Sequence, residues 1–430
     1  MVAAVDAARA YGAAMAATLE RRLGMLDAIV IGLGSMVGAG VFVAFAPAAA
    51  AAGPLLGAGL AVALVVAYCN ASSSARLAAL YPESGGTYVY GRERLGPFWG
   101  YLAGWAFVAG KLASCAAMAL TVGAYLWPSA MRPVAVAVVA GVTALNYRGV
   151  HRSALATRVI VAFVLLVLAV AVAATWAGPE AVCALCTDDD SGDQPLLGVL
   201  RAAGFLFFAF AGYARLATLG EEVRDPARTI PRAIAVALGV TAVVYAVVGA
   251  ASVRALGLEA LATSSAPLVD AVEAAGAAAA VPLVRVGAAV AALGSLLALV
   301  LGVSRTVFAM SRDGHLPRAL ERVHPAYRVP HRAEVAVGAV VALAVLAGDL
   351  RQAMGFSSVC VLAYYAIANA SAWTLRRSWR SRLVPVLGLT GCVAVGLALP
   401  VASVAAGLAV LSIGVVVWAL RPRAASDLRR

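Results

Sequence analysis

A series of long apolar runs, separated by short polar segments, restricts the fold of this chain more than any other feature of its sequence. About 20 apolar residues in a helix cross a bilayer core about 30 Å thick, and most of these runs are close to that length or longer. Backbone groups in lipid need internal hydrogen bonds, which helices supply. The sequence therefore predicts an all-α integral membrane protein with twelve transmembrane helices. The expected spans are residues 25–50, 54–79, 93–126, 131–147, 153–177, 197–221, 231–254, 281–311, 333–348, 352–375, 383–399 and 401–420.

The charged residues fit the same interpretation. Only 13% of the residues are charged and 63% are hydrophobic, which is unlike a soluble globular protein. A net charge of +12 could indicate nucleic acid binding in a soluble chain. Here the arginines lie between apolar runs, so they are better explained by membrane orientation. The lipid bilayer, and no nucleic acid, is the expected partner.

The arginines are distributed unevenly between the two sides. If the N-terminus is placed inside, only five arginines fall on outer segments, and the inner segments hold most of the others. The positive-inside rule then places both termini in the cytoplasm. We expect a cytoplasmic segment over residues 1–24, a membrane domain over 25–420 and a cytoplasmic tail over 421–430. The five outer arginines are Arg132, Arg201, Arg254, Arg285 and Arg351.

Cysteines and histidines do not form a pattern typical of a metal site or an enzyme. The four histidines lie in inner loops without a ligand cluster, and no metal or cofactor is expected. Cys183 and Cys186 lie in a loop expected outside, where a disulfide is allowed, and whether they pair stays open. The remaining cysteines are expected to pack as small apolar residues. They are Cys69, Cys115, Cys360 and Cys392.

The first span contains an unusual cluster of glycines. Gly32, Gly34, Gly38 and Gly40 fall within the apolar stretch Ile31–Phe42. Glycine is a poor helix former and lets backbone approach a ligand closely. This stretch either opens the helix to bind a ligand or forms a small-residue seam for helix packing, since it also fits Gly-x-x-x-Gly.

The sixth span shows a second irregularity. It is apolar up to Ala211, and then Gly212, Arg215 and Gly220 interrupt it. We expect a half-helix, a break near Ala211–Tyr213 and a short inner half. The two irregular spans are five apart, so they run in opposite directions. Interrupted spans at matching positions of two halves indicate an inverted-repeat transporter with a central binding site.

Lys111 is the only lysine in the chain and lies in the middle of the third span. An ionisable group inside the membrane indicates function. Lys111 could load and release a coupling proton or act as a fixed charge that replaces a cation. The alternatives are a structural ion pair or a lysine that extends to the membrane surface.

Five segments, in order over about residues 25–375, resemble signatures of the amino acid–polyamine–organocation superfamily and in particular its bacterial amino acid permeases. The match covers the interrupted first and sixth spans, the connection between the second and third spans, and the ends of the fourth and eighth spans. The segments are Gly34–Phe42, Tyr81–Trp105, Asn146–Val150, Phe207–Arg232 and Ser304–Pro317.

The resemblance implies the leucine-transporter-like fold. It has a five-plus-five inverted repeat, here about 25–177 and 197–375, followed by two helices over 383–420. It also implies secondary transport by alternating access in the bacterial cytoplasmic membrane, with proton-coupled uptake of neutral amino acids as the expected activity. The alternatives are an exchanger or exporter, or a polyamine or cationic amino acid carrier. Many relatives have an acid where Ala214 stands, and several have a lysine at the position of Val164; neither role transfers.

The resemblance, together with the positive end of the outer half-helix, assigns the substrate carboxylate to the first interruption. The N–H groups of Gly38, Ala39 and Gly40 are expected to bind the carboxylate. Ser35 can add a hydroxyl, and Val37 completes the segment.

Carbonyl groups freed in the sixth span are expected to bind the substrate ammonium. They belong to Phe210, Ala211 and Gly212, and Tyr213 is expected to form a gate or a pocket wall, or to pack. Ser295 in the eighth span is expected to face the first interruption, where relatives place a cation or its substitute.

The inner end of the sixth span carries a cluster of charges. Glu221, Glu222 and Arg224 could form an inner gate with Arg92 or Arg94, or could simply be solvated.

Overall fold

The computed structural model describes residues 23–81, 85–149, 154–181, 195–217, 223–375 and 379–421. Apart from a single parallel bridge between Leu23 and Val223, the regular elements of these residues are helices. Most of the expected terminal segments, together with Cys183 and Cys186, lie outside these ranges. The α-helices are α2 (Met25–Met36), α3 (Gly40–Val43), α4 (Phe45–Ala52), α5 (Leu56–Leu80), α6 (Thr87–Leu95), α7 (Pro97–Leu126), α8 (Met131–Tyr147), α9 (Ala154–Ala177), α10 (Pro195–Phe210), α11 (Ala214–Ala217), α12 (Pro226–Thr263), α13 (Pro267–Ala274), α14 (Val281–Arg312), α15 (His331–Ala347), α16 (Leu350–Trp373), α17 (Trp379–Ala398) and α18 (Val401–Ala419). The 3₁₀ turns are η1 (Gly53–Leu55), η2 (Pro128–Ala130), η3 (Ala211–Tyr213), η4 (Ala278–Ala280) and η5 (Arg318–Glu321).

Within the described ranges, ten helical segments are long and apolar enough to cross a membrane. They correspond to ten of the twelve predicted runs. The ninth run forms α15, which has 17 residues. The eleventh forms α17, whose apolar part, Arg382–Ala398, is likewise shorter than the 18 residues of a candidate span. The chain is thus an all-helical membrane protein with ten candidate spans and two further apolar helices.

Two of the predicted span boundaries are wrong. The third span does not begin at residue 93, because α6 is a separate helix and α7 begins at Pro97, a residue favoured in the first turn of a helix. The seventh predicted run covers residues 231–254, whereas α12 begins earlier, at Pro226. Its predicted end lies close to a kink at Gly257, where φ is 75°, and the chain is helical again from there to Thr263. Just before this kink, Arg254 donates a hydrogen bond to the Thr175 carbonyl at 2.6 Å and pairs with Glu180 at 2.9 Å.

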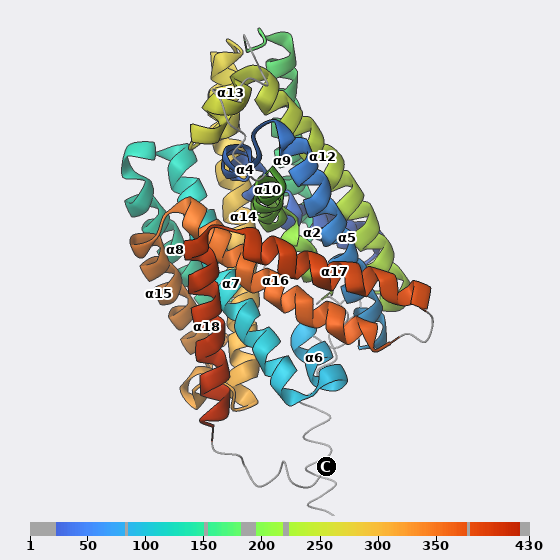
Figure 1. Ribbon diagram of the computed structural model, residues 1–430. Helices are drawn as coiled ribbons and strands as arrows, with labels where there is room; N and C mark the ends of the chain where they lie inside the picture. Colours follow the sequence, from blue (N-terminus) through green and yellow to red (C-terminus); the bar gives the residue numbers. More distant parts are fainter. Residues whose placement is uncertain are drawn as a thin grey trace, which may run out of the picture.

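Burial separates central helices from peripheral ones. In the most apolar windows of α7 and α16, 72% of the residues are buried, against 17% in the windows of η2–α8 and of α18. Figure 1 shows α2, α4 and α10 in the middle of the bundle, with α8 and α15 beside each other at one edge. The interrupted helices therefore lie inside the bundle. Four cysteines are buried and unpaired, as expected of packing residues: Cys69, Cys115, Cys360 and Cys392.

Candidate functional site

The first predicted interruption is confirmed by the backbone. Helix α2 ends at Met36 and α3 begins at Gly40, so Val37, Gly38 and Ala39 are outside regular helix. The Val37 N–H still donates to the Leu33 carbonyl at 2.6 Å. Within the described part of the chain, the N–H groups of Gly38 and Ala39 have no backbone acceptor. These two donors are among the three, with the N–H of Gly40, that were predicted to bind a carboxylate.

The second interruption also lies where the sequence predicts it. Helix α10 ends at Phe210, the 3₁₀ turn η3 covers Ala211–Tyr213, and α11 follows from Ala214 to Ala217. A 3₁₀ turn changes the direction of the carbonyls and weakens their helical hydrogen bonds. Phe210, Ala211 and Tyr213 are buried. The carbonyls at this turn are therefore available to partners from other helices.

The two interruptions contact each other directly. A methyl group built on Gly212 would lie 2.2 Å from the Ser35 carbonyl oxygen and 2.7 Å from the Met36 nitrogen. Only a residue without a side chain allows the two backbones to approach this closely. The interruptions of the first and sixth spans, 175 or so residues apart in the chain, thus form one buried region.

Lys111 reaches this region from α7. Its side chain is only 7% exposed, and its ammonium nitrogen donates to the Ala211 carbonyl at 3.4 Å. Among the residues that the structure describes, no carboxylate lies within 4.0 Å of the Lys111 ammonium. The contact is therefore between a buried cation and a carbonyl of η3, and the structural ion pair considered from the sequence is not formed by the described residues.

Ser295 in α14 lies at the first interruption, in the position expected for it. Its hydroxyl donates to the Gly34 carbonyl at 3.3 Å, and a methyl group on Gly38 would lie 2.2 Å from the same oxygen. The Ser35 hydroxyl instead donates to the Ile31 carbonyl of its own helix at 2.8 Å. Ser35 thus keeps only acceptor capacity toward a ligand.

Tyr213 is completely buried and stacks on another aromatic ring. Its ring centroid lies 5.0 Å from that of Tyr365 in α16, and the ring of Phe207 in α10 lies 5.9 Å from that of Tyr365. The Tyr213 ring thus packs η3 against α16. This position is compatible with both roles considered from the sequence, a gate and a packed wall.

Tyr245 of α12 is a site residue that sequence reasoning missed. Its hydroxyl contacts two carbonyls, Met36 of the first interruption at 2.5 Å and Ala209 of α10 at 3.2 Å. A buried tyrosine hydroxyl requires a polar partner, and Tyr245 is the sole tyrosine within the apolar run 231–254. A single hydroxyl in an otherwise apolar run was the feature of the sequence that could have identified Tyr245 as a site residue. Tyr245 connects the ends of both broken helices.

Replacing Tyr245 by phenylalanine should destabilise the protein and slow transport. The ring is kept, but two buried carbonyls lose their shared donor, which costs about 1–3 kcal/mol. We expect a lower apparent Tm in detergent and a lower initial uptake rate in vesicles. Tyr68→Phe is the matched control, because Tyr68 is 55% exposed on α5. Equal behaviour of the two variants would contradict a bracing role for Tyr245.

The predicted inner gate can be described only in part. Glu221 and Glu222 lie outside the described residues, and the Arg224 N–H donates to the Leu23 carbonyl at 2.9 Å. Arg92 pairs with Glu93 at 3.0 Å and approaches Asp313 at 3.8 Å. Arg94 donates two hydrogen bonds to Thr374, each at 2.8 Å. Arg92 and Arg94 thus contact α6, the end of α14 and the end of α16.

A second polar cluster on this side was not predicted. The Tyr88 hydroxyl donates to the Asp313 carboxylate and lies 2.7 Å from Nδ1 of His315. Burial and the Asp313 carboxylate raise the pKa of the Tyr88 hydroxyl, which therefore keeps its proton. The Tyr88 hydroxyl has a single proton, which it donates to Asp313. Toward His315 it is therefore the acceptor, and His315 donates through Nδ1–H. Burial and the Arg421 guanidinium, with a smaller contribution from Arg92, lower the pKa of His315 to about 4, although Asp313 opposes the shift.

This cluster predicts a pH-dependent stability. Between about pH 4 and 6.5, folded His315 is neutral whereas the unfolded chain binds a proton there. The unfolded state then binds more protons, so stability falls as the pH is lowered through this window. His315→Asn can keep the donor to Tyr88 without titrating. Its apparent Tm should fall less steeply from pH 7 to pH 5 than that of the wild type, and equal slopes would contradict the assignment.

Taken together, these residues define a multi-pass helical membrane protein in which two broken helices contact each other around a buried lysine. The chain belongs to the amino acid permease family, which matches residues 23–423. The resemblance seen in the sequence is thereby confirmed, and the family is one of transporters, not enzymes.

Individual relatives match nearly the whole chain. An uncharacterized transporter of Mycobacterium tuberculosis is 63% identical over 406 residues, which cover 94% of this chain and 92% of the relative. The branched-chain amino acid permease BcaP of Bacillus subtilis is 26% identical over 454 residues, 96% of this chain and 95% of that protein. The methylthioribose transporter of Bacillus subtilis is 28% identical over 410 residues, 86% of each chain. The names of the two Bacillus relatives state different cargoes, and the name of the mycobacterial relative states none.

Proposed function

We propose that this protein is a secondary active transporter that takes up neutral amino acids across the bacterial cytoplasmic membrane, with alternating access coupled to protons. The observation that carries the proposal is the contact between the Lys111 ammonium and the Ala211 carbonyl at 3.4 Å. It brings the only lysine of the chain to the contact between the two interrupted spans. A buried group that exchanges a proton there would link protonation to movement of the broken helices.

The substrate contacts in this proposal are mainly backbone groups. The N–H groups of Gly38, Ala39 and Gly40 receive the carboxylate, because the short helix α3 begins there and has a positive end. Carbonyls of Phe210, Ala211 and Gly212 receive the ammonium. Since Lys111 already contacts Ala211, substrate binding and the position of the Lys111 side chain compete for this carbonyl. That competition supplies a physical route for coupling.

Two observations support the proposed substrate class, the absence of an acid at one position and the name of one relative. Ala214 begins α11, where an acidic residue would favour a second cationic group on the substrate. BcaP is named as a branched-chain amino acid permease. Both observations support neutral amino acids over polyamines or cationic amino acids.

The remaining parts of the proposal concern architecture. We assign twelve spans, with α15 and α17 completing the ten candidates, and two inverted repeats over about 25–177 and 197–375. Both termini lie in the cytoplasm. Tyr213 closes the site toward the inside, and Glu221, Glu222 and Arg224 form the inner gate.

Uptake into proteoliposomes of the purified protein tests the function. A panel of neutral, acidic and cationic amino acids and a polyamine is presented with and without an inward proton gradient. Accumulation of a neutral amino acid only with the gradient is the expected result. Uptake without accumulation but with trans-stimulation would identify an exchanger, and preference for a polyamine would overturn the substrate class. No transport of any amine by a correctly folded protein would refute the proposal as a whole.

A further inference from the structure

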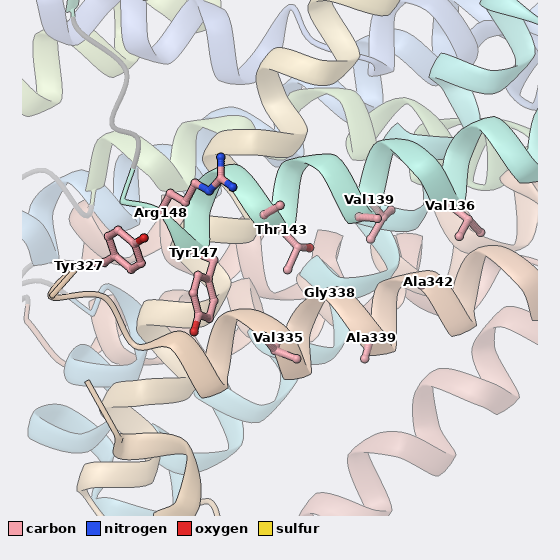
Figure 2. Close-up of a pocket in the computed structure, with 12 residues that line it drawn as sticks. Val136, Val139, Thr143, Tyr147, Arg148, Tyr327, Val335, Gly338, Ala339 and Ala342 are labelled. Atoms are coloured by element: carbon pink, nitrogen blue, oxygen red, sulfur yellow. The ribbon is translucent and has the colours of Figure 1, made fainter. Parts of the chain in front are cut away.

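A groove runs along the surface of the bundle between α8 and α15, outside the region formed by the broken helices. The volume of the groove is about 640 Å³. Figure 2 shows the two helices along its length, with Arg148, Tyr147 and Tyr327 at one end and Val136 and Ala342 at the other. Its full lining is Val136, Val139, Ala140, Thr143, Ala144, Tyr147, Arg148, Tyr327, Val335, Gly338, Ala339 and Ala342.

The body of the groove is apolar and opens away from the bundle. Ala140 and Ala144 of α8 and Val335 and Ala339 of α15 are exposed on the outer surface of the protein. Helix α8 corresponds to the fourth predicted span and α15 to the ninth. The surrounding medium at this depth is therefore hydrocarbon, and the occupant that matches an apolar groove open to it is an acyl chain.

One end of the groove has a different chemistry. The Tyr147 ring contacts three other rings there, His324 at 5.5 Å, Tyr327 at 6.1 Å and His331 at 6.0 Å. Arg148 follows Tyr147 at the end of α8 and is exposed. Tyrosines gather at the interface between hydrocarbon and water. This end thus lies at the depth of lipid headgroups, on the side that the arginine distribution assigns to the cytoplasm.

The electrostatic environment of that end is positive. The segment 312–332 carries five arginines and only two acids, and one of those acids, Asp313, is engaged by Tyr88 and Arg92. Within the described residues, Arg148 has no carboxylate within 4.0 Å. A phosphate is the complementary group.

We propose that the α8–α15 groove binds a phospholipid with an anionic headgroup, one acyl chain lying along the groove and the phosphate at Arg148. Charge complementarity selects the headgroup, and the apolar walls select the chain. The cytoplasmic leaflet supplies such lipids, and each arginine near its surface contributes about 1 kcal/mol to their binding. The site is separate from the proposed substrate contacts, so it does not depend on which substrate the protein carries.

Photolabelling in detergent micelles tests the site. The probes are a phosphatidylglycerol and a phosphatidylcholine that carry the same diazirine-bearing acyl chain, and labelled peptides are mapped by mass spectrometry. The expected result is labelling of α8 and α15 that favours phosphatidylglycerol by about fivefold, as one arginine contact predicts. Equal labelling by the two lipids would overturn the proposal, because that result would indicate only general contact with lipid and no selection of the headgroup.

Matched variants locate the two parts of the site. Arg148→Ala should remove the preference for phosphatidylglycerol and Arg148→Lys should retain it, whereas Arg228→Ala, which alters another exposed arginine, should have no effect. Ala339→Phe fills the groove and should lower labelling by both lipids. Val340→Phe is its control, because Val340 is 46% exposed on α15 and does not line the groove.

These measurements do not require transport, so a failure of the proposed function leaves them interpretable. Size-exclusion profiles of each variant confirm that it is folded. Labelling that is unaffected by both Arg148→Ala and Ala339→Phe would place the lipid elsewhere. Crosslinks from the groove to a second copy of the chain, in place of lipid, would likewise overturn the proposal.

Discussion

Lys111→Met should abolish accumulation of substrate driven by a proton gradient. Methionine keeps most of the length and apolar volume of the lysine stem but removes the ammonium that donates to the Ala211 carbonyl. A buried hydrogen bond from a charged group contributes about 1.5–3 kcal/mol, so the loss of the contact alone should lower initial uptake by about 10- to 100-fold. The measurement is uptake into proteoliposomes with an imposed pH gradient, compared with exchange at equal pH on both sides.

The comparison of gradient-driven uptake and exchange separates the two roles considered for Lys111. If its ammonium carries the coupling proton, Lys111→Met and Lys111→Arg both lose accumulation, and exchange survives at a reduced rate. If it is a fixed charge that replaces a cation, Lys111→Arg retains transport with the wild-type dependence on pH. Ser114→Ala is the matched control, since Ser114 is also buried in α7 but bonds to Ser357 at 2.6 Å. Unchanged gradient-driven uptake by Lys111→Met would rule out both roles.

The parts of this site that sequence reasoning found are those whose signal lies within a short stretch of chain. The interruption at Val37–Ala39 falls within the glycine cluster of the first span, and the one at Ala211–Tyr213 falls where Gly212 and the nearby Arg215 interrupt the apolar sixth span. Lys111 was also found locally, because a charge in an apolar run stands out. Its partner could not be found in this way, since a carbonyl of η3 has no side-chain signature.

The parts that were missed depend on contacts between distant segments. Tyr245 bonds to the carbonyls of Met36 and Ala209, and every residue has a carbonyl, so nothing in the sequence marks these two as its partners. The Tyr88–Asp313–His315 cluster joins α6 to the loop after α14 in the same manner. The α6–α7 boundary was missed for another reason. The predicted run began at Glu93, inside α6, although Gly96 and Pro97 mark the break between the two helices in the sequence itself.

Gly212→Ala should cause the largest loss of stability and activity among single methyl additions at the broken helices. The new methyl group would lie 2.2 Å from the Ser35 carbonyl oxygen and 2.4 Å from the Ser35 carbonyl carbon. Both are backbone atoms that cannot rotate away, so the two broken helices must separate. Overpacking of this kind costs about 1–3 kcal/mol or more. We expect a lower apparent Tm in detergent and at least a tenfold loss of initial uptake in proteoliposomes.

Two other glycines show whether the backbone contact is the cause. Gly239→Ala places its methyl in open space on α12 and should leave the apparent Tm unchanged or raise it, because alanine favours a helix. In Gly38→Ala, by contrast, the nearest atom is the hydroxyl of Ser295 at 2.2 Å, which belongs to a side chain. Adding Ser295→Gly should therefore restore part of the loss in Gly38→Ala, whereas no single side-chain truncation can rescue Gly212→Ala. If Gly212→Ala behaves like Gly239→Ala, the interruptions are not in contact in the folded protein, and a site shared between them becomes untenable.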